Sequence, residues 1–254
     1  MAVHLAKGTR DFLPRQMSIR NSVINTLRGI FTRYGFEAVE TPAFERIETL
    51  TGKYSSENDK LTYRIHKRGK EATPGECDLA LRYDLTVPLA RLVAMHPELR
   101  MPFKRYQIQP VWRADRPQKG RFREFYQCDI DILGTESTTA DAECIAVIAD
   151  GLQALGFKQY SVLLNDRRIL SDFAQLAGAT TETEELSVLT SIDKLDKIGQ
   201  VRVADELRAK GFKPEGLDPL WTLMDAQKDN AAILETISGF VTERGLAGIE
   251  TLKQ

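Results

Sequence analysis

The sequence of 254 residues predicts an α+β fold in which an antiparallel sheet is flanked by helices. The sheet is expected within residues 1–168, and a mostly helical segment is expected over residues 169–254. Three observations support this prediction: strands with a two-residue period come in hairpin pairs, helices flank the hairpins, and strand patterns nearly vanish after about residue 170. Neither a βαβ repeat nor the glycine signature of a Rossmann or P-loop site occurs in the sequence.

The composition is that of an ordinary globular protein, with 42% hydrophobic residues, 28% charged residues and a formal net charge of −1. No apolar run approaches 18 residues, and the N-terminal residues contain no apolar signal core. The sequence therefore predicts neither a membrane span nor a secretory leader. The three cysteines and three histidines are scattered, which indicates reduced thiols in the cytoplasm and no metal site.

A helix and a strand are predicted near the N-terminus. Apolar residues recur at three- and four-residue spacing over Met17–Tyr34 and predict an amphipathic helix that stops at Gly35. The next residues, Phe36–Pro42, have the composition of a strand. Because proline is confined to the ends and edges of strands, Pro42 fits a strand that lies at a boundary between subunits.

The first predicted hairpin pairs Tyr63–Ile65 with Asp78–Arg82 across the charged loop Lys67–Glu76. A helix is predicted directly after it. Thr86 is a good residue to cap the N-terminus of that helix, and Pro88 is well suited to its first turn.

The second predicted hairpin pairs Phe103–Arg113 with Arg121–Leu133 across a turn-rich loop. From residue 127 onward its second strand alternates, with apolar residues and Cys128 at even positions and polar residues at odd positions: Gln127, Asp129 and Asp131. A strand with one such polar face is expected to form the floor of a polar site rather than part of a dry core.

Four arginines cluster around the loop of this hairpin and suit a polyanionic ligand such as a nucleoside triphosphate: Arg113, Arg116, Arg121 and Arg123. A hairpin with a basic loop is, however, more often only a solvated turn.

Further elements are predicted toward the C-terminus. Thr135–Leu155 reads as a helix capped by Thr138 or Thr139, and Tyr160–Asn165 reads as an apolar strand. The remaining predicted helices begin near Ile169 and then cover Glu184–Thr190, Gly199–Lys210, Pro219–Met224 and Ala231–Gly245.

The runs V-W-R-A-D and G-R-F-R-E-F-Y-Q-C-D of the second hairpin resemble motif 2 of class II aminoacyl-tRNA synthetases, specifically of the histidyl-tRNA synthetase family. Three more runs are similar to that family: K-G-T-R-D-F-L-P near the N-terminus, L-R-Y-D-L-T at the end of the first hairpin, and D-K-L-D-K-I-G in the helical part. The helix and strand that lead to Pro42 resemble the dimer-forming motif 1. The resemblance covers essentially the whole chain and implies the class II catalytic fold over residues 1–168 with a helical insertion over residues 169–254.

The resemblance implies that Arg113 is the catalytic arginine that contacts the α-phosphate of ATP. Arg121 becomes a candidate contact for the γ-phosphate or the tRNA acceptor end, as does Arg123, although either arginine could be merely solvated. Glu124 would meet the adenine end of ATP or order the loop. In the helical insertion, Lys194 and Lys197 are either tRNA phosphate contacts or part of a solvated helix face.

The same resemblance assigns four residues to L-histidine. Asp84 and Thr86 are expected to hold its amino group, and Gln127 and Asp131 are expected to line the floor of its pocket. Asp131 is the expected reader of the imidazole, because a partnered carboxylate rejects side chains that cannot hydrogen-bond to it.

The partners implied by the resemblance are L-histidine, ATP with Mg²⁺, tRNA(His) and a second copy of the chain in a homodimer. Mg²⁺ is expected to be held largely by the phosphates. Family members continue with a histidine loop, motif 3 and an anticodon-binding domain, so this sequence is expected to be an N-terminal portion of such an enzyme.

Two alternatives stay open. The first is a regulatory subunit of ATP phosphoribosyltransferase, which would bind histidine without aminoacylation but would not need Arg113 or the motif 2 loop. The second is a fragment that retains the dimer surface but performs no chemistry.

Overall fold

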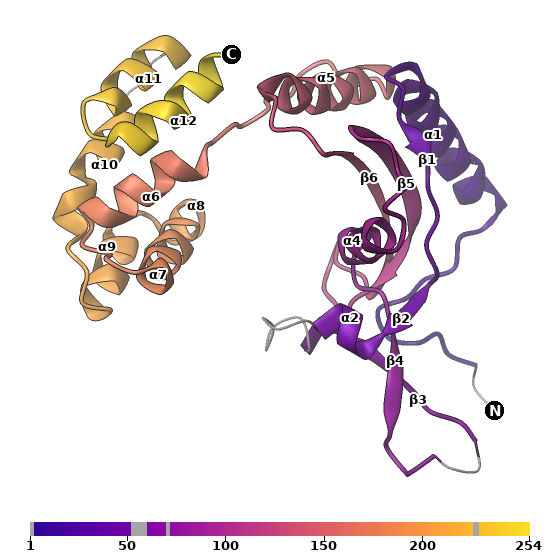
Figure 1. Cartoon of the computed structure of the whole chain (residues 1–254). Coiled ribbons are helices and arrows are strands. Elements are labelled where there is room, and N and C mark those ends of the chain that lie inside the picture. Colours follow the sequence, from indigo (N-terminus) through magenta and orange to yellow (C-terminus); the bar gives the residue numbers. More distant parts are fainter. Residues whose placement is uncertain (1–2, 52–59, 70–71, 226–228) are drawn as a thin grey trace. The chain divides into compact units, whose positions relative to one another are not determined.

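The computed structural model describes residues 3–51, 60–69, 72–225 and 229–254. The chain divides into two compact units, Met1–Tyr160 (unit 1) and Ser161–Gln254 (unit 2), as Figure 1 shows. The division falls a little before the boundary at residue 168 that the sequence suggests.

The described strands of unit 1 form two three-stranded sheets. In the first, β5 (Phe103–Trp112) lies between β1 (Glu37–Ala38) and β6 (Glu124–Leu133). β5 and β6 form the predicted antiparallel hairpin, paired along their whole length. β1 pairs with β5 in parallel, which the prediction of an antiparallel sheet did not include. A parallel partner is possible here because a long stretch of chain separates β1 from β5, whereas a tight turn allows only antiparallel pairing.

In the second sheet, β4 (Cys77–Leu81) lies between β2 (Phe44–Arg46) and β3 (Tyr63–His66), and both pairings are antiparallel. The β3–β4 hairpin confirms the first predicted hairpin, although residues 70 and 71 of its loop lie outside the described residues. β2 and the short helix α2 (Ile47–Thr51) were not predicted, because elements of three and five residues are too short to show a period.

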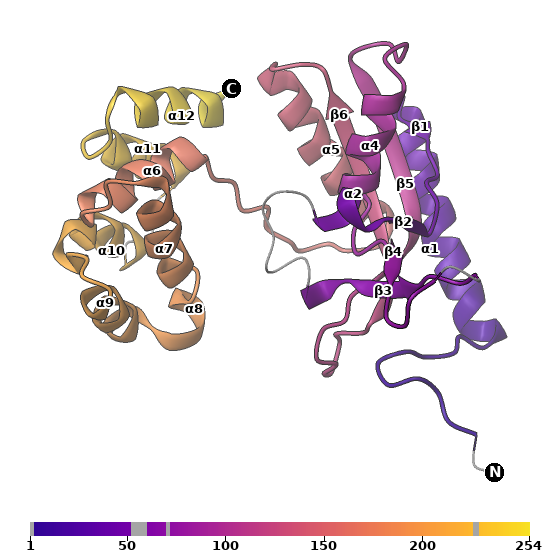
Figure 2. The same cartoon turned by 60° about the horizontal axis from the view of Figure 1, so that its bottom comes forward.

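Three longer helices surround the β5–β6 hairpin: α1 (Pro14–Arg33), α4 (Thr86–Met95) and α5 (Thr138–Ala154). Figures 1 and 2 show α1 and α5 on one side of the hairpin and α4 on the other. The side toward α1 and α5 carries a hydrophobic cluster built on Ile30, Phe31, Phe36, Tyr106 and Val147. The apolar face of the hairpin is therefore covered by α1 and α5, and its polar face is turned toward α4.

The cap of α5 differs from the prediction. Ser137 is the N-cap residue, and its side-chain oxygen accepts a hydrogen bond from the backbone N–H of Thr139 at 3.3 Å. Thr138 and Thr139 lie inside the helix. The predicted cap, Thr138 or Thr139, was wrong. Ser137, Thr138 and Thr139 all carry a hydroxyl that suits an N-cap position, so the residue type alone does not decide among them.

The described part of unit 2 contains helices and no strands. Its hydrophobic cluster includes Phe173, Val188 and Leu207, all nearly inaccessible to solvent. The elements are α6 (Arg167–Leu176), α7 (Glu182–Ile192), α8 (Leu195–Ile198), α9 (Gln200–Ala209), the 3-10 helix η1 (Pro214–Leu217), α10 (Asp218–Asp225), α11 (Asn230–Ser238) and α12 (Glu243–Lys253).

Two predictions for this region were wrong. The single helix expected over Ala231–Gly245 is interrupted between α11 and α12, where the Asp172 carboxylate accepts a hydrogen bond from the Thr242 backbone N–H at 2.7 Å. The strand expected at Tyr160–Asn165 does not form, because no backbone among the described residues pairs with it and an apolar pattern cannot supply a ladder partner.

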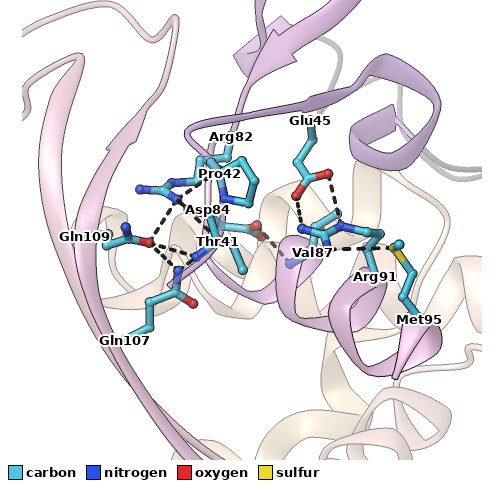
Figure 3. A network of polar contacts seen from close by, with 10 residues as sticks. All are labelled: Thr41, Pro42, Glu45, Arg82, Asp84, Val87, Arg91, Met95, Gln107 and Gln109. Atoms are coloured by element: carbon cyan, nitrogen blue, oxygen red, sulfur yellow. Dashed lines mark hydrogen bonds and ion pairs between the residues drawn. The ribbon is translucent and has the colours of Figure 1, made fainter. Parts of the chain in front are cut away.

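Arg82 is buried beside the polar face of the hairpin, where its hydrogen bonds connect separate segments of unit 1 (Figure 3). Arg82 is 1% exposed, and its guanidinium donates to the backbone oxygens of Thr41, Pro42 and Pro110 at 2.6–3.0 Å. It also donates to Gln109 Oε1 at 3.0 Å. Burial lowers the pKa of Arg82, and the nearby carboxylates of Glu40 and Glu45 oppose that shift. The residue therefore connects the segment after β1 to strand β5.

Replacing Arg82 by Met should destabilise unit 1 by about 3 kcal/mol, because buried carbonyl oxygens lose a charged donor. Hydrogen exchange of the β5 and β6 amides measures this loss in unit 1 alone. Arg46→Met is the matched control, since the Arg46–Glu48 pair is exposed, and it should change stability by less than about 0.5 kcal/mol. A loss below about 1 kcal/mol for Arg82→Met would contradict this role.

Candidate active site

The polar face of the β5–β6 hairpin forms a continuous floor. Residues two apart on a strand point to the same side, so three successive cross-strand pairs line this face: Arg105↔Asp131, Gln107↔Asp129 and Gln109↔Gln127. Arg105 and Gln107 are completely buried, whereas Gln127, Asp129 and Asp131 are partly exposed. The accessible part of the floor therefore lies on β6, and Arg105 and Gln107 on the neighbouring strand β5 form its buried part. We call these six residues the polar floor.

Unpaired polar atoms are concentrated in the polar floor. Among the described residues, five buried side-chain nitrogen or oxygen atoms have no hydrogen-bond partner, and four of them belong to Arg105 (Nε and Nη2), Gln127 (Oε1) and Asp131 (Oδ2). Arg105 Nη2 and Asp131 Oδ2 nevertheless form an ion pair at 2.5 Å. Buried polar atoms in folded proteins are nearly always hydrogen-bonded, so the two floor atoms that remain without any partner, Arg105 Nε and Gln127 Oε1, point to a ligand site.

Asp84 lies between β4 and α4 and faces the charges of the polar floor. Its Oδ1 accepts a hydrogen bond from the Val87 backbone N–H at 3.1 Å. Burial raises the pKa of Asp84, while the positive charges of Arg113 and Arg105 oppose that shift. Asp84 thus has a structural role in capping α4 that the sequence analysis did not recognise, and this bond fixes the position of its carboxylate.

Thr86 does not cap α4, contrary to the prediction. It is the first residue of the helix, and Leu85 is the N-cap residue, without a side-chain hydrogen bond. Thr86 is exposed, and its hydroxyl makes no hydrogen bond with any residue that the structure describes. The hydroxyl is therefore available to a ligand beside Asp84.

Arg113 directly follows β5, and within the described residues only the Nε atom of its guanidinium forms a hydrogen bond. Its Nε donates to the Tyr83 backbone oxygen at 2.9 Å, and its Cζ lies 5.1 Å from the centroid of the Phe125 ring. In the described part of the chain, nothing forms a hydrogen bond or ion pair with Nη1 or Nη2. The side chain is thus fixed while its two terminal nitrogens remain available to an anion.

The loop after Arg113 is ordered by its own side chains. Arg121 pairs with Asp115 Oδ2 through Nε at 3.0 Å and Nη2 at 2.5 Å, and Arg123 Nε donates to the Asp115 backbone oxygen at 3.0 Å. Across the hairpin, Trp112 Nε1 donates to Glu124 Oε2 at 2.7 Å. The predicted ATP ligands Arg121 and Glu124 therefore already have partners within the hairpin.

The N-terminal segment packs against this loop. The backbone N–H of Arg123 donates to the Gly8 oxygen at 2.8 Å. Gly8 has φ +87°, and a Cβ there would come within 2.9 Å of the Arg123 side chain. Glycine is thus required at position 8 by both conformation and close contact, which gives the K-G-T-R run a structural role beside the site.

The electrostatic balance of the polar floor is negative. Burial raises the pKa of Asp129 and of Asp131, and the positive charge of Arg105 opposes both shifts. Asp84, Asp129 and Asp131 all act on the single Arg105 guanidinium. Three carboxylates near two cations, the buried Arg105 and the partly buried Arg113, still leave a surplus of negative charge that suits a ligand carrying an ammonium group.

Arg82, Arg105 and Gln107 were not predicted as site residues from the sequence. Each is a buried polar residue that completes the network beneath the predicted site residues. A signal was present for two of them: once β6 pairs with β5 in antiparallel register, the polar period of Gln127–Asp131 must continue through Gln107 and Arg105 on the same face.

The described residues contain neither a cluster of metal ligands nor a helix that could cross a membrane. No group of three or more histidine, cysteine, aspartate or glutamate side chains is arranged to hold a metal ion. No helix combines the length and apolar character needed to cross a membrane.

The fold is an α+β domain with a polar face suited to a ligand, and comparisons with known proteins give the family. Residues 8–254 match the family model described as histidyl-tRNA synthetase. The chain therefore belongs to the histidyl-tRNA synthetase family. It is 45% identical to the histidine–tRNA ligase of Cytophaga hutchinsonii over 98% of this chain and 59% of that protein. The chain thus spans less than two thirds of the length of this curated relative.

Solved structures agree with this assignment. A histidyl-tRNA synthetase from Nostoc sp. PCC 7120 matches with a TM-score of 0.82 and 31% identity, covering all of this chain and 57% of that one. A Bacillus halodurans protein described as an ATP phosphoribosyltransferase regulatory subunit/histidyl-tRNA synthetase matches with a TM-score of 0.79 at 20% identity, covering 100% of this chain and 63% of that one; this likeness concerns the fold alone. The predicted α+β fold of the synthetase type is confirmed.

Replacing Asp129 by Asn should make unit 1 more stable at pH 7. The folded-state pKa of Asp129 is raised by burial, so its ionised form costs stability above that pKa, and this cost disappears below the ordinary aspartate pKa of about 3.9. The advantage of the variant, measured by urea unfolding, should therefore shrink to zero as the pH falls below about 4. Asp205→Asn, at an exposed site, is the control and should show little change. An Asp129→Asn protein no more stable than the wild type at pH 7 would contradict this account.

Proposed function

We propose that the chain carries the histidine-activating site of a histidine–tRNA ligase. In the proposed reaction, the carboxylate of L-histidine attacks the α-phosphate of ATP, forms histidyl-adenylate and releases pyrophosphate, and the histidyl group is then transferred to tRNA(His). One observation carries the proposal: the Arg113 guanidinium, with two free nitrogens, lies close enough to the polar floor to act on Asp84 and Asp129. A cationic phosphate contact thus adjoins the negatively charged polar floor.

This chemistry needs no nucleophile from the protein. Two anions must be brought together, and the charge that develops between them must be neutralised. The planar fork of Arg113 suits this task, because it can contact a carboxylate oxygen and a phosphate oxygen at once. Its single bond to Tyr83 keeps the side chain in place without occupying the terminal nitrogens.

The proposed histidine pocket uses the residues around the polar floor. Asp84 binds the ammonium by a charge-assisted hydrogen bond, and the exposed Thr86 hydroxyl lies beside it on the first turn of α4. Gln127 contributes its unpaired Oε1, and Asp131 accepts the N–H of the imidazole ring.

The ATP side of the site is formed by the hairpin loop. Glu124, held by Trp112, orders the loop and meets the adenine end, and Arg121 reaches the γ-phosphate or the acceptor end once ATP or tRNA replaces Asp115 as its partner. Mg²⁺ enters with ATP and is held mainly by phosphate oxygens.

The larger assignments follow from the family. Residues 1–168 are proposed to be the class II catalytic core with motifs 1 and 2, and residues 169–254 its helical insertion. A homodimer is supported by exposed apolar side chains on and just before α1, namely Leu13, Ile19 and Val23. The proposed setting is protein synthesis in the cytoplasm. In the insertion, Lys194 pairs with Glu206 at 2.7 Å, which favours a structural role for this lysine.

Arg113→Ala should lower histidine-dependent ATP–pyrophosphate exchange by at least about 100-fold, comparable to the loss of one oxyanion donor. Arg113→Lys keeps the charge but loses the fork, so it should recover only a small part of the rate. Arg202→Ala, an exposed arginine of α9, is the control and should leave exchange within about threefold of the wild type.

Exchange by Arg113→Ala within a few-fold of the wild type would contradict the role of Arg113. A wild-type chain that binds histidine but shows no exchange would contradict adenylation by this chain, and it would favour the fragment without chemistry or the regulatory subunit over the enzyme.

A further inference from the structure

The strongest unexplained feature of the polar floor is a buried guanidinium. Arg105 is 0% exposed, yet its Nε has no hydrogen-bond partner. Its Nη1 donates to Gln107 Oε1 at 3.3 Å, and its Nη2 forms the 2.5 Å ion pair with Asp131 Oδ2. Burying an arginine is costly unless its charge is paired, so its presence beneath the site calls for a role.

The ion pair uses only one oxygen of Asp131. Oδ2 is buried against Arg105, whereas the Asp131 side chain as a whole is 29% exposed. Within the described chain, no donor forms a hydrogen bond with Oδ1. Arg105 thus fixes the carboxylate at one oxygen and leaves the other available on the accessible side of the polar floor.

We infer that Arg105 is the positioning residue of the histidine pocket: by holding Asp131 Oδ2, it orients Oδ1 as an acceptor for the imidazole N–H and so sets the selectivity for histidine. This inference rests on the proposed function and deepens it. Arg105 itself touches no substrate; it acts through Asp131.

Selectivity follows from the same geometry. A ligand whose ring has no N–H leaves Oδ1 without a donor, and a site with an unpaired buried acceptor rejects that ligand strongly. Without Arg105, the carboxylate can rotate away or take up a proton, and the penalty against such a ligand is lost.

Several other groups interact electrostatically with this carboxylate or its neighbours, and they lie on elements on both sides of the hairpin. They are Asp129 on β6, Asp84 before α4, Arg113 after β5 and Cys144 on α5. Arg105 is the group that opposes the rise of the Asp131 pKa caused by burial. Loss of Arg105 should therefore raise the pKa of Asp131 further. As the pH falls, the Asp131 carboxylate would then take up a proton sooner, so histidine binding should begin to weaken at a higher pH than in the wild type.

The test is calorimetric titration of the full chain with L-histidine and with β-(2-thienyl)alanine, an amino acid of similar shape whose ring lacks an N–H. The wild type should favour histidine by at least about 100-fold. Arg105→Met should weaken histidine binding by at least about tenfold and change thienylalanine binding by less than about threefold. It should also move the pH below which histidine binding weakens (the acid limb) up by about one pH unit. Arg105→Lys should restore most of the selectivity.

Arg91→Met is the matched control, because Arg91 forms an equally short ion pair of 2.5 Å with the buried Glu45, outside the polar floor (Figure 3). It should lower stability and leave the selectivity for histidine unchanged. A purely structural role of Arg105 predicts that both ligands lose affinity together and that the pH limb does not move, and this result would overturn the inference.

The titration distinguishes a failure of the proposed function from a failure of the role assigned to Arg105. If the wild type binds no histidine, the proposed function fails and the inference fails with it. If the wild type selects histidine and Arg105→Met selects it equally well, only the role of Arg105 is refuted.

Discussion

Unit 1 depends on the burial of two positively charged side chains at the polar face of the β5–β6 hairpin. Arg82 and Arg105 are almost inaccessible to solvent, and hydrogen bonds connect them through Gln109 Oε1, Gln107 Nε2 and Gln107 Oε1, with distances of 3.0, 2.6 and 3.3 Å. The path ends at the ion pair with Asp131. Neither guanidinium tolerates the loss of its partners, so the network fixes the backbone after β1 and the carboxylate of the site together.

This constraint explains why one hairpin can serve both the core and the site. The two-residue period of a strand gives β5 and β6 an apolar face, which packs on α1 and α5, and a polar face, which is turned toward α4. Packing of the apolar face makes the hairpin rigid, so the side chains of its polar face are also held in place. A ligand site of this kind needs little rearrangement to hold two anions in reacting positions.

Part of this arrangement could be predicted from the sequence, and part could not. The alternation over Gln127–Asp131 was sufficient to place three polar side chains on one face, because the strand period does not depend on neighbours. The burial of Arg105 does depend on them, since only the fold supplies its partners. The strand expected at Tyr160–Asn165 and the helix expected over Ala231–Gly245 failed for a similar reason: a strand needs a ladder partner, and the helix is interrupted by a bond to Asp172, 70 residues away in the sequence.

In the proposed function, the polar floor reads the histidine side chain while Arg113 holds the α-phosphate. The most direct measurement is a crystal structure of this chain with L-histidine and a non-hydrolysable ATP analogue. We expect an imidazole nitrogen about 3 Å from Asp131 Oδ1, the ammonium at Asp84, and an α-phosphate oxygen at a similar distance from the Arg113 terminal nitrogens. Histidine bound elsewhere, or its ring turned away from Asp131, would contradict the account.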